Sequence, residues 1–216
     1  MIQIEKMTFN PFQENTYVLY DETKECIIID PGCYEKNEQN KLVDFIAKND
    51  LKPVKIVNTH GHIDHVLGNY FVHKTYGIDV VGHENLKQQL AAVPTYSSMY
   101  GFNAYQPSPD PVTLLKEGDV LKFGNSALDV YFCPGHAPDH LVFHHTGQGF
   151  VINGDVLFKG SFGRIDLPGG DFETLKNSIL NTMFKLPDDT VVYTGHGEET
   201  TIGVEKISNP IHHASF

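Results

Sequence analysis

Ligand-type side chains are concentrated in one short stretch, Thr59-His60-Gly61-His62-Ile63-Asp64-His65. Imidazole nitrogens and carboxylate oxygens are groups with which proteins bind zinc and related cations. The residues just before it, Val54-Lys55-Ile56-Val57-Asn58, are rich in β-branched side chains and predict a buried strand. On one helix, His60 and His62 would point about 200° apart. We therefore place the histidines in a loop at the carboxyl end of that strand, where open α/β sheets bind their ligands.

The length of the chain, 216 residues, is enough for a sizeable core, and we expect a single domain over residues 1–216. The three cysteines are odd in number and show no C-x-x-C spacing, so a cysteine-rich structural zinc site is not indicated. Residues 1–6 lack the apolar stretch of a signal peptide, and no apolar run is long enough to cross a bilayer. We expect a soluble, cytoplasmic protein with no membrane partner.

The charge balance is acidic, with 16 Lys and Arg against 27 Asp and Glu and a net charge of -11. No run of five or more basic residues occurs, and binding to a phosphate backbone depends on such positive charge. Nucleic acid is therefore not expected as a partner, whereas a small-molecule substrate is. The sequence leaves the oligomeric state open.

The order of the predicted elements indicates an α/β fold. Strands are expected at 2–9, 16–20, 26–29, 54–58, 78–81, 120–123, 128–132, 141–145, 150–152 and 190–193, and helices at 38–48, 69–76 and 172–186. Strands followed by helices occur twice, which suggests two similar halves packed face to face. Between them, residues 94–111 contain four prolines and several aromatic residues and predict a long loop. Its aromatic side chains either form the wall of a functional site or pin the loop onto the core.

Three more ligand-type residues follow predicted strands in the second half. They occur in Pro134-Gly135-His136, Asn153-Gly154-Asp155 and Thr194-Gly195-His196-Gly197. Glycine beside each one lets the backbone turn sharply, so that the side chain can face a shared pocket. A single histidine after a strand is more often a capped surface residue. Four strand-end loops with ligand-type residues together predict a common metal site.

This set of residues resembles the ligand set of the metallo-β-lactamase fold superfamily. The resemblance implies a four-layer αββα sandwich with the metal site along one edge of two paired sheets. By this match, His60, His62 and His136 would hold one metal ion. Asp64, His65 and His196 would hold the second, and Asp155 would bridge the two. Asp30 would support the site without being a ligand.

Further stretches resemble the small bacterial relatives of hydroxyacylglutathione hydrolase, or glyoxalase II. They are Asn10-Pro11-Phe12, residues 160–166, Pro168-Gly169-Gly170 and residues 195–203. The resemblance implies a thioester hydrolase. Glyoxalase II enzymes have a C-terminal helical domain that binds glutathione, whereas this sequence ends about twenty residues after His196, so we expect weak selectivity for the thiol. Class B β-lactamases lack the aspartate found here at position 64, which weighs against that activity.

The chemistry expected of two cations that share Asp155 is hydrolytic. Their charge lowers the pKa of a shared water from about 15.7 towards about 7, so a bridging hydroxide can attack a carbonyl at neutral pH. Asp64 and Asp155 are thus expected to be catalytic through the metal-bound nucleophile. A thiolate leaves readily because thiols have a pKa near ~8.5. Imidazoles mixed with carboxylates suit zinc, which we expect, and also iron or manganese.

Two other functions remain open at this stage. One is a mononuclear iron persulfide dioxygenase, because those enzymes share the same loop motif. The other is a non-catalytic metal-binding module. Lys159 and Arg164 are candidates for binding an anionic substrate, although Arg164 and Asp166 can equally form a structural ion pair. His140 is either a support of the metal site or a packing residue.

Overall fold

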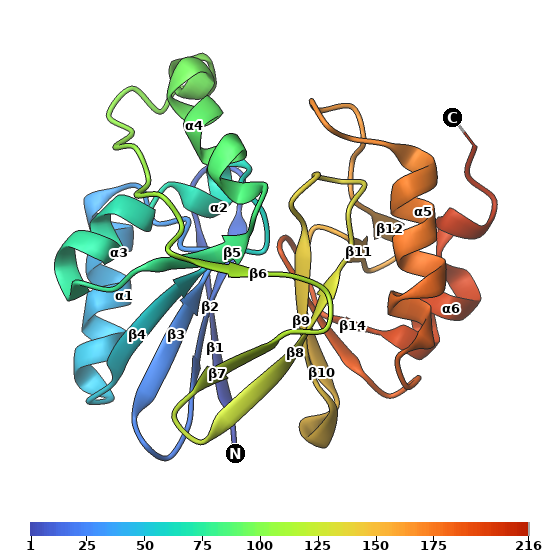
Figure 1. Ribbon diagram of the computed structural model, residues 1–216, viewed down its shortest axis with the longest axis horizontal. Helices are drawn as coiled ribbons and strands as arrows, with labels where there is room; N and C mark the ends of the chain where they lie inside the picture. Colours follow the sequence, from blue (N-terminus) through green and yellow to red (C-terminus); the bar gives the residue numbers. More distant parts are fainter. Residues whose placement is uncertain (216) are drawn as a thin grey trace.

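Two six-stranded sheets face each other in the computed structural model, which describes residues 1–215 (Figure 1). The first sheet has the order β1 (Gln3–Phe9), β2 (Glu14–Tyr20), β3 (Glu25–Ile29), β4 (Lys52–Val57), β5 (Val80–His83), β6 (Thr113–Leu115). The second has the order β14 (Thr200–Thr201), β13 (Val191–Thr194), β10 (Phe150–Gly154), β9 (Leu141–His145), β8 (Ser126–Phe132), β7 (Val120–Phe123). A hairpin of β11 (Leu157–Phe158) and β12 (Ser161–Phe162) stands apart from both.

Helices cover the outer face of each sheet. The first sheet carries α1 (Lys36–Lys48) and α3 (Asn69–Tyr76), with α4 (Leu86–Tyr96) above its upper edge, and the second carries α5 (Phe172–Asn181) and α6 (Ile202–Ser208) (Figure 1). A one-turn helix, α2 (Ile63–Val66), lies at the upper edge of the first sheet. The resulting order of layers, helices, sheet, sheet and helices, confirms the predicted four-layer αββα sandwich.

Strand β3 has apolar side chains on both of its faces. Its side chains alternate between faces, and Ile27, Ile28 and Ile29 are all fully buried. Ile27 and Ile29 pack in the layer between the two sheets, whereas Ile28 packs with the residues of α1, α3 and α4. Three consecutive isoleucines therefore fit a strand that is covered on both sides.

Polar contacts join the two sheets at both ends of β2. Near its start, the Tyr17 hydroxyl donates to the carbonyl of Thr194 at 2.7 Å, and Asn15 Nδ2 donates to the same carbonyl at 3.0 Å. Just after its end, the buried carboxylate of Asp21 accepts hydrogen bonds from Asn125 N and from the hydroxyl of Ser126, both at 2.7 Å. The first pair of contacts fixes the two sheets relative to each other beside the ligand-type loops, and the second does so at the opposite end of the strand.

Several predicted elements differ from the observed ones. Helix α4 was not predicted: residues 82–93 were left unassigned, and the loop expected from Pro94 begins in the last turn of this helix, whose buried stripe is Leu86, Leu90 and Val93. The helix predicted at 172–186 ends at Asn181 and is followed by a 3₁₀ turn, Met183–Lys185. Strands β6, β11, β12 and β14 and helices α2 and α6 were also missed, because elements of two to seven residues carry little periodicity.

Among residues 1–215, no helix combines the length and the apolar character that crossing a bilayer requires. All three cysteines are buried and unpaired, as expected for Cys26 from its apolar neighbours. The two sheets share one apolar layer, and the organisation of residues 1–216 as a single domain stays a prediction.

Candidate metal centre

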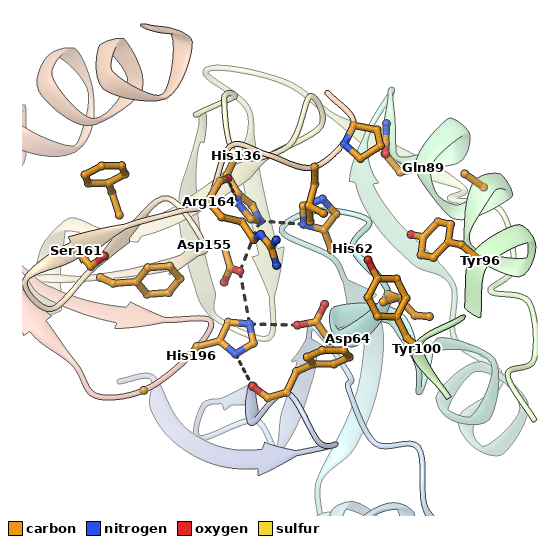
Figure 2. A pocket seen from close by; sticks show the side chains of 18 of the residues that line it. His62, Asp64, Gln89, Tyr96, Tyr100, His136, Asp155, Ser161, Arg164 and His196 are labelled. Atoms are coloured by element: carbon orange, nitrogen blue, oxygen red, sulfur yellow. Dashed lines mark hydrogen bonds and ion pairs between the residues drawn. The ribbon is translucent and has the colours of Figure 1, made fainter. Parts of the chain in front are cut away.

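All seven predicted ligand residues come together at one edge of the sandwich, between the two sheets. Figure 2 shows His62, Asp64, His136, Asp155 and His196 among them. His60 and His62 follow β4, and Asp64 and His65 lie on α2. The remaining three follow strands of the second sheet: His136 lies between β8 and β9, Asp155 follows β10 and His196 follows β13. The carboxyl ends of strands in both sheets therefore supply one site.

One group of ligand atoms consists of three imidazoles. His60, His62 and His136 each offer a ring nitrogen, and these nitrogens lie within 4.8 Å of one another. His62 Nδ1 lies 2.8 Å from His136 Nε2. The predicted first metal position is thus formed by three nitrogen donors that converge.

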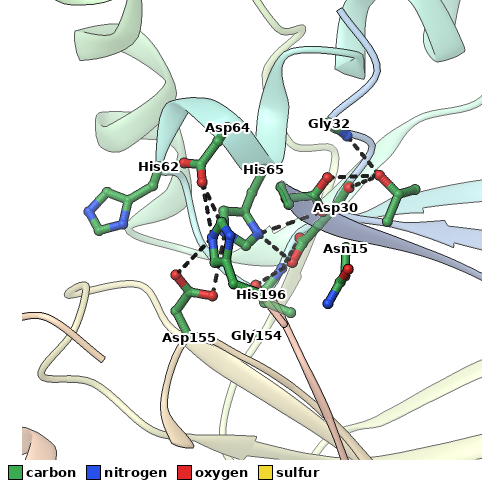
Figure 3. A network of polar contacts seen from close by, with 12 residues as sticks. Asn15, Asp30, Gly32, His62, Asp64, His65, Gly154, Asp155 and His196 are labelled. Carbon is green, nitrogen blue, oxygen red and sulfur yellow. Dashed lines mark hydrogen bonds and ion pairs between the residues drawn. The ribbon is translucent and has the colours of Figure 1, made fainter. Parts of the chain in front are cut away.

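A second group contains Asp64, His65 and His196, again with ligand atoms within 4.8 Å of one another (Figure 3). Asp64 Oδ2 lies 3.1 Å from His196 Nε2 and 3.6 Å from His65 Nε2. His65 is fully buried, whereas the side chain of His196 keeps contact with solvent. This second position therefore opens onto the cavity in front of the site.

Asp155 lies between the two groups. Its Oδ2 atom is 3.5 Å from His136 Nε2 in the first group and 3.5 Å from His196 Nε2 in the second. Its Oδ1 atom is 3.5 Å from His65 Nε2. One carboxylate therefore reaches imidazoles of both groups, which is the geometry that a bridging ligand requires.

Hydrogen bonds on the far side of the rings determine which nitrogen faces the site. Nδ1 of His136 donates to the carbonyl of Arg164 at 2.8 Å, and Nδ1 of His196 donates to the carbonyl of Phe12 at 3.0 Å, because a carbonyl can only accept. In the neutral form of both rings, Nε2 is then the nitrogen that is free to bind a cation. Such outer bonds hold metal-binding histidines in one tautomer and orientation.

Asp30 fixes two more rings (Figure 3). Its Oδ2 atom accepts from the Thr59 hydroxyl at 2.6 Å and from His65 Nδ1 at 3.1 Å, and its Oδ1 atom accepts from Thr59 N at 2.7 Å. Since the Thr59 hydroxyl proton points to Asp30, its oxygen accepts from Nδ1 of His60 at 3.0 Å. Asp30 also lies within reach of His60 and His65 as a possible ligand, but its occupied oxygens favour the supporting role.

The donor set fits divalent cations. His60 Nε2, His65 Nε2 and Asp155 Oδ1 are buried and have no hydrogen-bond partner among the described residues. Buried polar atoms are nearly always paired, so these three atoms indicate a ligand that the polypeptide does not supply. Five imidazoles and two carboxylates suit zinc, iron or manganese. Each of the two groups offers ligand atoms that could hold such a cation.

Burial and charge set the protonation of the site. Burial, together with the neighbouring His136, lowers the pKa of His62 to about 3, and burial likewise holds the pKa of His60 well below its usual value. Burial alone would raise the pKa of Asp155, but His65 and His196 lower it well below the ordinary range. Neutral His60 and His62 beside an ionised Asp155 are in the state that binds a metal ion. In the second group burial would lower the pKa of His196, but hydrogen bonds to Asp155 and Asp64 raise it to about 9, so a metal ion there would displace a proton.

His140 supports the site from behind. Its ring stacks on that of His60 with centroids 4.6 Å apart, and its Nε2 accepts from the backbone N–H of Asp155 at 3.0 Å. It is fully buried. Of the two alternatives left by the sequence, the supporting role is the one that these contacts favour.

Glycine acts in two different ways beside these ligands. Gly135 and Gly154 have positive φ angles of 125° and 52°, so the expected sharp turns occur there. Gly195 is required for space instead, because a Cβ atom there would collide with Asp155 Oδ1 and lie 2.8 Å from His65 Cε1. The sequence could not distinguish these two reasons.

A cavity of about 850 Å³ lies in front of the ligand residues. Lys159 and Arg164, the predicted substrate-binding residues, both line it. Lys159 Nζ forms an ion pair with Glu198 at 2.6 Å, and Arg164 forms a bidentate pair with Asp166, with both contacts at 2.7 Å. Their role in binding a substrate stays a prediction.

The aromatic residues of 94–111 take both of the roles proposed for them. Tyr96 and Tyr100 line the cavity (Figure 2), whereas Phe102 and Tyr105 are buried in the core. Phe12 and Met99 also line the cavity and were not predicted from the sequence. Their exposure as large apolar side chains becomes apparent only in the folded chain.

The chain belongs to the metallo-beta-lactamase superfamily, whose family model matches residues 9–196. It is 34% identical over 210 residues to hydroxyacylglutathione hydrolase GloC of Haemophilus influenzae, and the match covers 97% of both chains. Two crystal structures are similar in fold and sequence. BLEG-1, described as a B3 metallo-beta-lactamase, is 33% identical with a TM-score of 0.89, covering 98% of this chain and 100% of that one. TTHA1623 in a di-iron-bound form is 34% identical with a TM-score of 0.84, covering 95% and 98%.

Proposed function

We propose that this protein is a dinuclear metal-dependent hydrolase of thioesters. The observation that supports this most directly is the position of Asp155, whose carboxylate reaches histidines of both ligand groups at 3.5 Å. A single ion could bind Asp155 together with two histidines of one group, whereas two ions would use the contacts of Asp155 with both groups. The similarity to a hydroxyacylglutathione hydrolase over nearly the whole chain supports the thioester as the substrate class.

Each ligand group would hold one ion. His60, His62 and His136 form the first position, and Asp64, His65 and His196 form the second, with Asp155 between them. We expect zinc at both positions, with iron or manganese as alternatives. Iron has additional support from the relative whose structure was solved in a di-iron-bound form.

When bound, the two ions would supply a bridging hydroxide as the nucleophile and would polarise the thioester carbonyl. The chain's own residues hold this chemistry in place. Asp64 and Asp155 balance the positive charge, and the bonds from Nδ1 of His65, His136 and His196 keep the rings aimed at the site. In the reaction the C–S bond breaks and water adds, which gives a carboxylate, a thiol and one proton. Thiols have a pKa near ~8.5, so no general acid is required.

Elemental analysis and a substrate panel test this proposal together. Protein purified without added metal should contain two ions per chain, and it should cleave lactoylglutathione and small neutral thioesters. Asp155→Ala should lower the metal content. It should also reduce turnover by more than roughly 10–100-fold, which is the usual effect of changing a residue that only orients a ligand. Asp44→Ala, on the exposed side of α1, is the matched control.

The same panel separates the alternatives. Oxygen uptake that depends on a persulfide, by the iron-loaded protein and without thioesterase activity of the zinc form, would show a dioxygenase. Cleavage of a β-lactam would show the activity for which BLEG-1 is described. Two bound ions with no turnover of any substrate would leave a non-catalytic metal-binding module.

A further inference from the structure

The cavity in front of the ligand groups has an apolar wall on the side of α4. Phe12 comes from the β1–β2 loop, Tyr96 from the end of α4, and Met99 and Tyr100 from the 3₁₀ turn Ser97–Tyr100 that follows (Figure 2). The rings of Phe12 and Tyr100 meet edge to face with centroids 5.8 Å apart, and those of Tyr96 and Tyr100 are 5.9 Å apart. Segments distant in sequence thus form one continuous surface.

Three of the four side chains of this wall are exposed to solvent. Met99 is 83% exposed, Tyr100 47% and Phe12 42%. Single exposed apolar side chains are common, but several in contact beside a cavity indicate a surface that binds an apolar group. Ile207 on α6 is 87% exposed but does not line the cavity, so its replacement is a control for changes in the wall.

The cations of the cavity offer little to an anionic substrate. Lys159 and Arg164 each have a carboxylate partner, Glu198 and Asp166. Exposed pairs such as these are weak and could open, but opening would leave the partner carboxylate beside the incoming anion. The net charge of the chain, -11, also disfavours the approach of anions.

We propose that the cavity selects thioesters that carry an uncharged apolar group, aliphatic or aromatic, and that Phe12, Tyr96, Met99 and Tyr100 receive this group. The inference rests on the proposed thioester hydrolysis and specifies its substrate class. The apolar group is attached either to the carbonyl carbon or to the sulfur, and the experiment varies the two sides separately.

The first measurement is kcat/KM along a series of N-acetylcysteamine thioesters with acetyl, butyryl and hexanoyl groups. A parallel series keeps the acetyl group and lengthens an alkyl thiol. Because burial of a methylene favours binding, we expect kcat/KM to rise up to about fourfold per methylene in one of the two series. The series that rises identifies the side of the thioester that contacts the wall.

Two variants test whether the rise in kcat/KM with chain length depends on the apolar wall. Met99→Ser should reduce the hexanoyl-to-acetyl ratio of kcat/KM, or the corresponding ratio of the thiol series. Ile207→Ser removes an equally exposed apolar side chain elsewhere and should leave both ratios unchanged. Calorimetric titration with a hexyl thioether, which cannot be hydrolysed, should show weaker binding to Met99→Ser than to the unmodified protein.

A charged analogue completes the test. The charged analogue is a thioester whose six-carbon acyl group ends in a carboxylate. Its kcat/KM should be at least about tenfold lower than that of the hexanoyl thioester. The carboxylate loses the gain from burying several methylenes, and Asp166 and Glu198 repel it. Asp166→Asn removes the ion pair of Arg164 and should reduce the difference in kcat/KM between the hexanoyl thioester and the charged analogue. Equal rates along both series, or a preference for the carboxylate, would overturn the inference while thioester hydrolysis itself stood. Failure to cleave any thioester would instead overturn the proposed function.

Discussion

Oδ2 of Asp30 lies 3.1 Å from Nδ1 of His65, and this contact leaves Nε2 of His65 as the nitrogen that faces the candidate metal centre. The same oxygen accepts from the Thr59 hydroxyl, which in turn orients His60. One buried carboxylate therefore orients a ring in each of the two ligand groups. A charged acceptor also raises the basicity of the ring that donates to it.

Replacing Asp30 by asparagine should weaken metal binding by about 10–100-fold, the usual effect of changing a residue that orients a ligand. Asp30 has a φ angle of 49°, and asparagine tolerates this backbone conformation, so the fold should remain. Competition with a chromogenic chelator measures the affinity of each ion. Asp44→Asn, at an exposed position of α1, is the control. An unchanged affinity in Asp30→Asn would show that the contact does not support the site.

The Gly195→Ala substitution should reduce the occupancy of the second metal position. The added Cβ would collide with Asp155 Oδ1 and crowd His65 Cε1 at 2.8 Å, so the carboxylate between the two groups must move. The φ angle of Gly195 is not in the left-handed region, so backbone strain does not contribute. Gly147→Ala is a control on an exposed turn, where the nearest atom is His145 Cε1 at 3.2 Å. Two fully occupied positions in Gly195→Ala would contradict the prediction.

The sequence predicted the candidate site well because each ligand-type residue lies close to a recognisable strand end. The histidine stretch follows a β-branched strand directly, and Gly135-His136, Gly154-Asp155 and Gly195-His196 each follow another strand, so the seven ligand-type residues could be named without coordinates. Isolated contacts between distant residues carry no such signal. The two hydrogen bonds that Asn10 donates to the carbonyls of Gly32 and Asp64 are examples, because nothing near Asn10 specifies those partners.

Helix α4 illustrates a different failure. Its apolar stripe of Leu86, Leu90 and Val93 has helical spacing, but no element was predicted for residues 82–93, and the loop was expected to begin at Pro94. A proline inside a helix removes one backbone hydrogen bond and crowds the carbonyl four residues earlier, and here the packing of the stripe in the apolar cluster of the first sheet outweighs that cost. The aromatic part of the cavity wall, Tyr96 and Tyr100, lies within the segment for which the sequence proposed this role, whereas Met99 and Phe12 were not predicted.

Asn10 should contribute to stability in two separable ways. Its side chain donates to the carbonyls of Gly32 at 3.1 Å and Asp64 at 3.0 Å, and its φ angle is 51°. Asn10→Ala loses the bonds and places alanine in the left-handed region, and we expect a loss of about 2–4 kcal/mol in the free energy of unfolding. Asn10→Gly loses the same bonds without the steric cost, so its loss should be about 1–2 kcal/mol smaller. Urea denaturation measures both, and equal losses would show that the backbone conformation costs nothing.

Asp21 should make the stability of the protein depend on pH in the acid range. Burial alone would raise its pKa, but hydrogen bonds from Thr23, Ser126 and Asn125 lower it to about 2 in the folded protein. The carboxyl of an unfolded chain has a pKa of about 3.9. Because the folded pKa is the lower one, ionised Asp21 contributes stability above the unfolded value, and this contribution disappears as the pH falls from about 4 to about 2.

The matching experiment compares the protein with its Asp21→Asn variant at several pH values. The shift in pKa corresponds to about 2–3 kcal/mol at pH 7 and to roughly half of that at pH 3. The difference in the free energy of unfolding between the two proteins should therefore shrink as the solution is acidified. Asp21 follows the end of β2 opposite to Glu14, which lies near His65, so loss of metal in acid affects both proteins alike and cancels. A difference that stayed constant between pH 7 and pH 3 would mean that the hydrogen bonds of Asp21 do not depend on its charge.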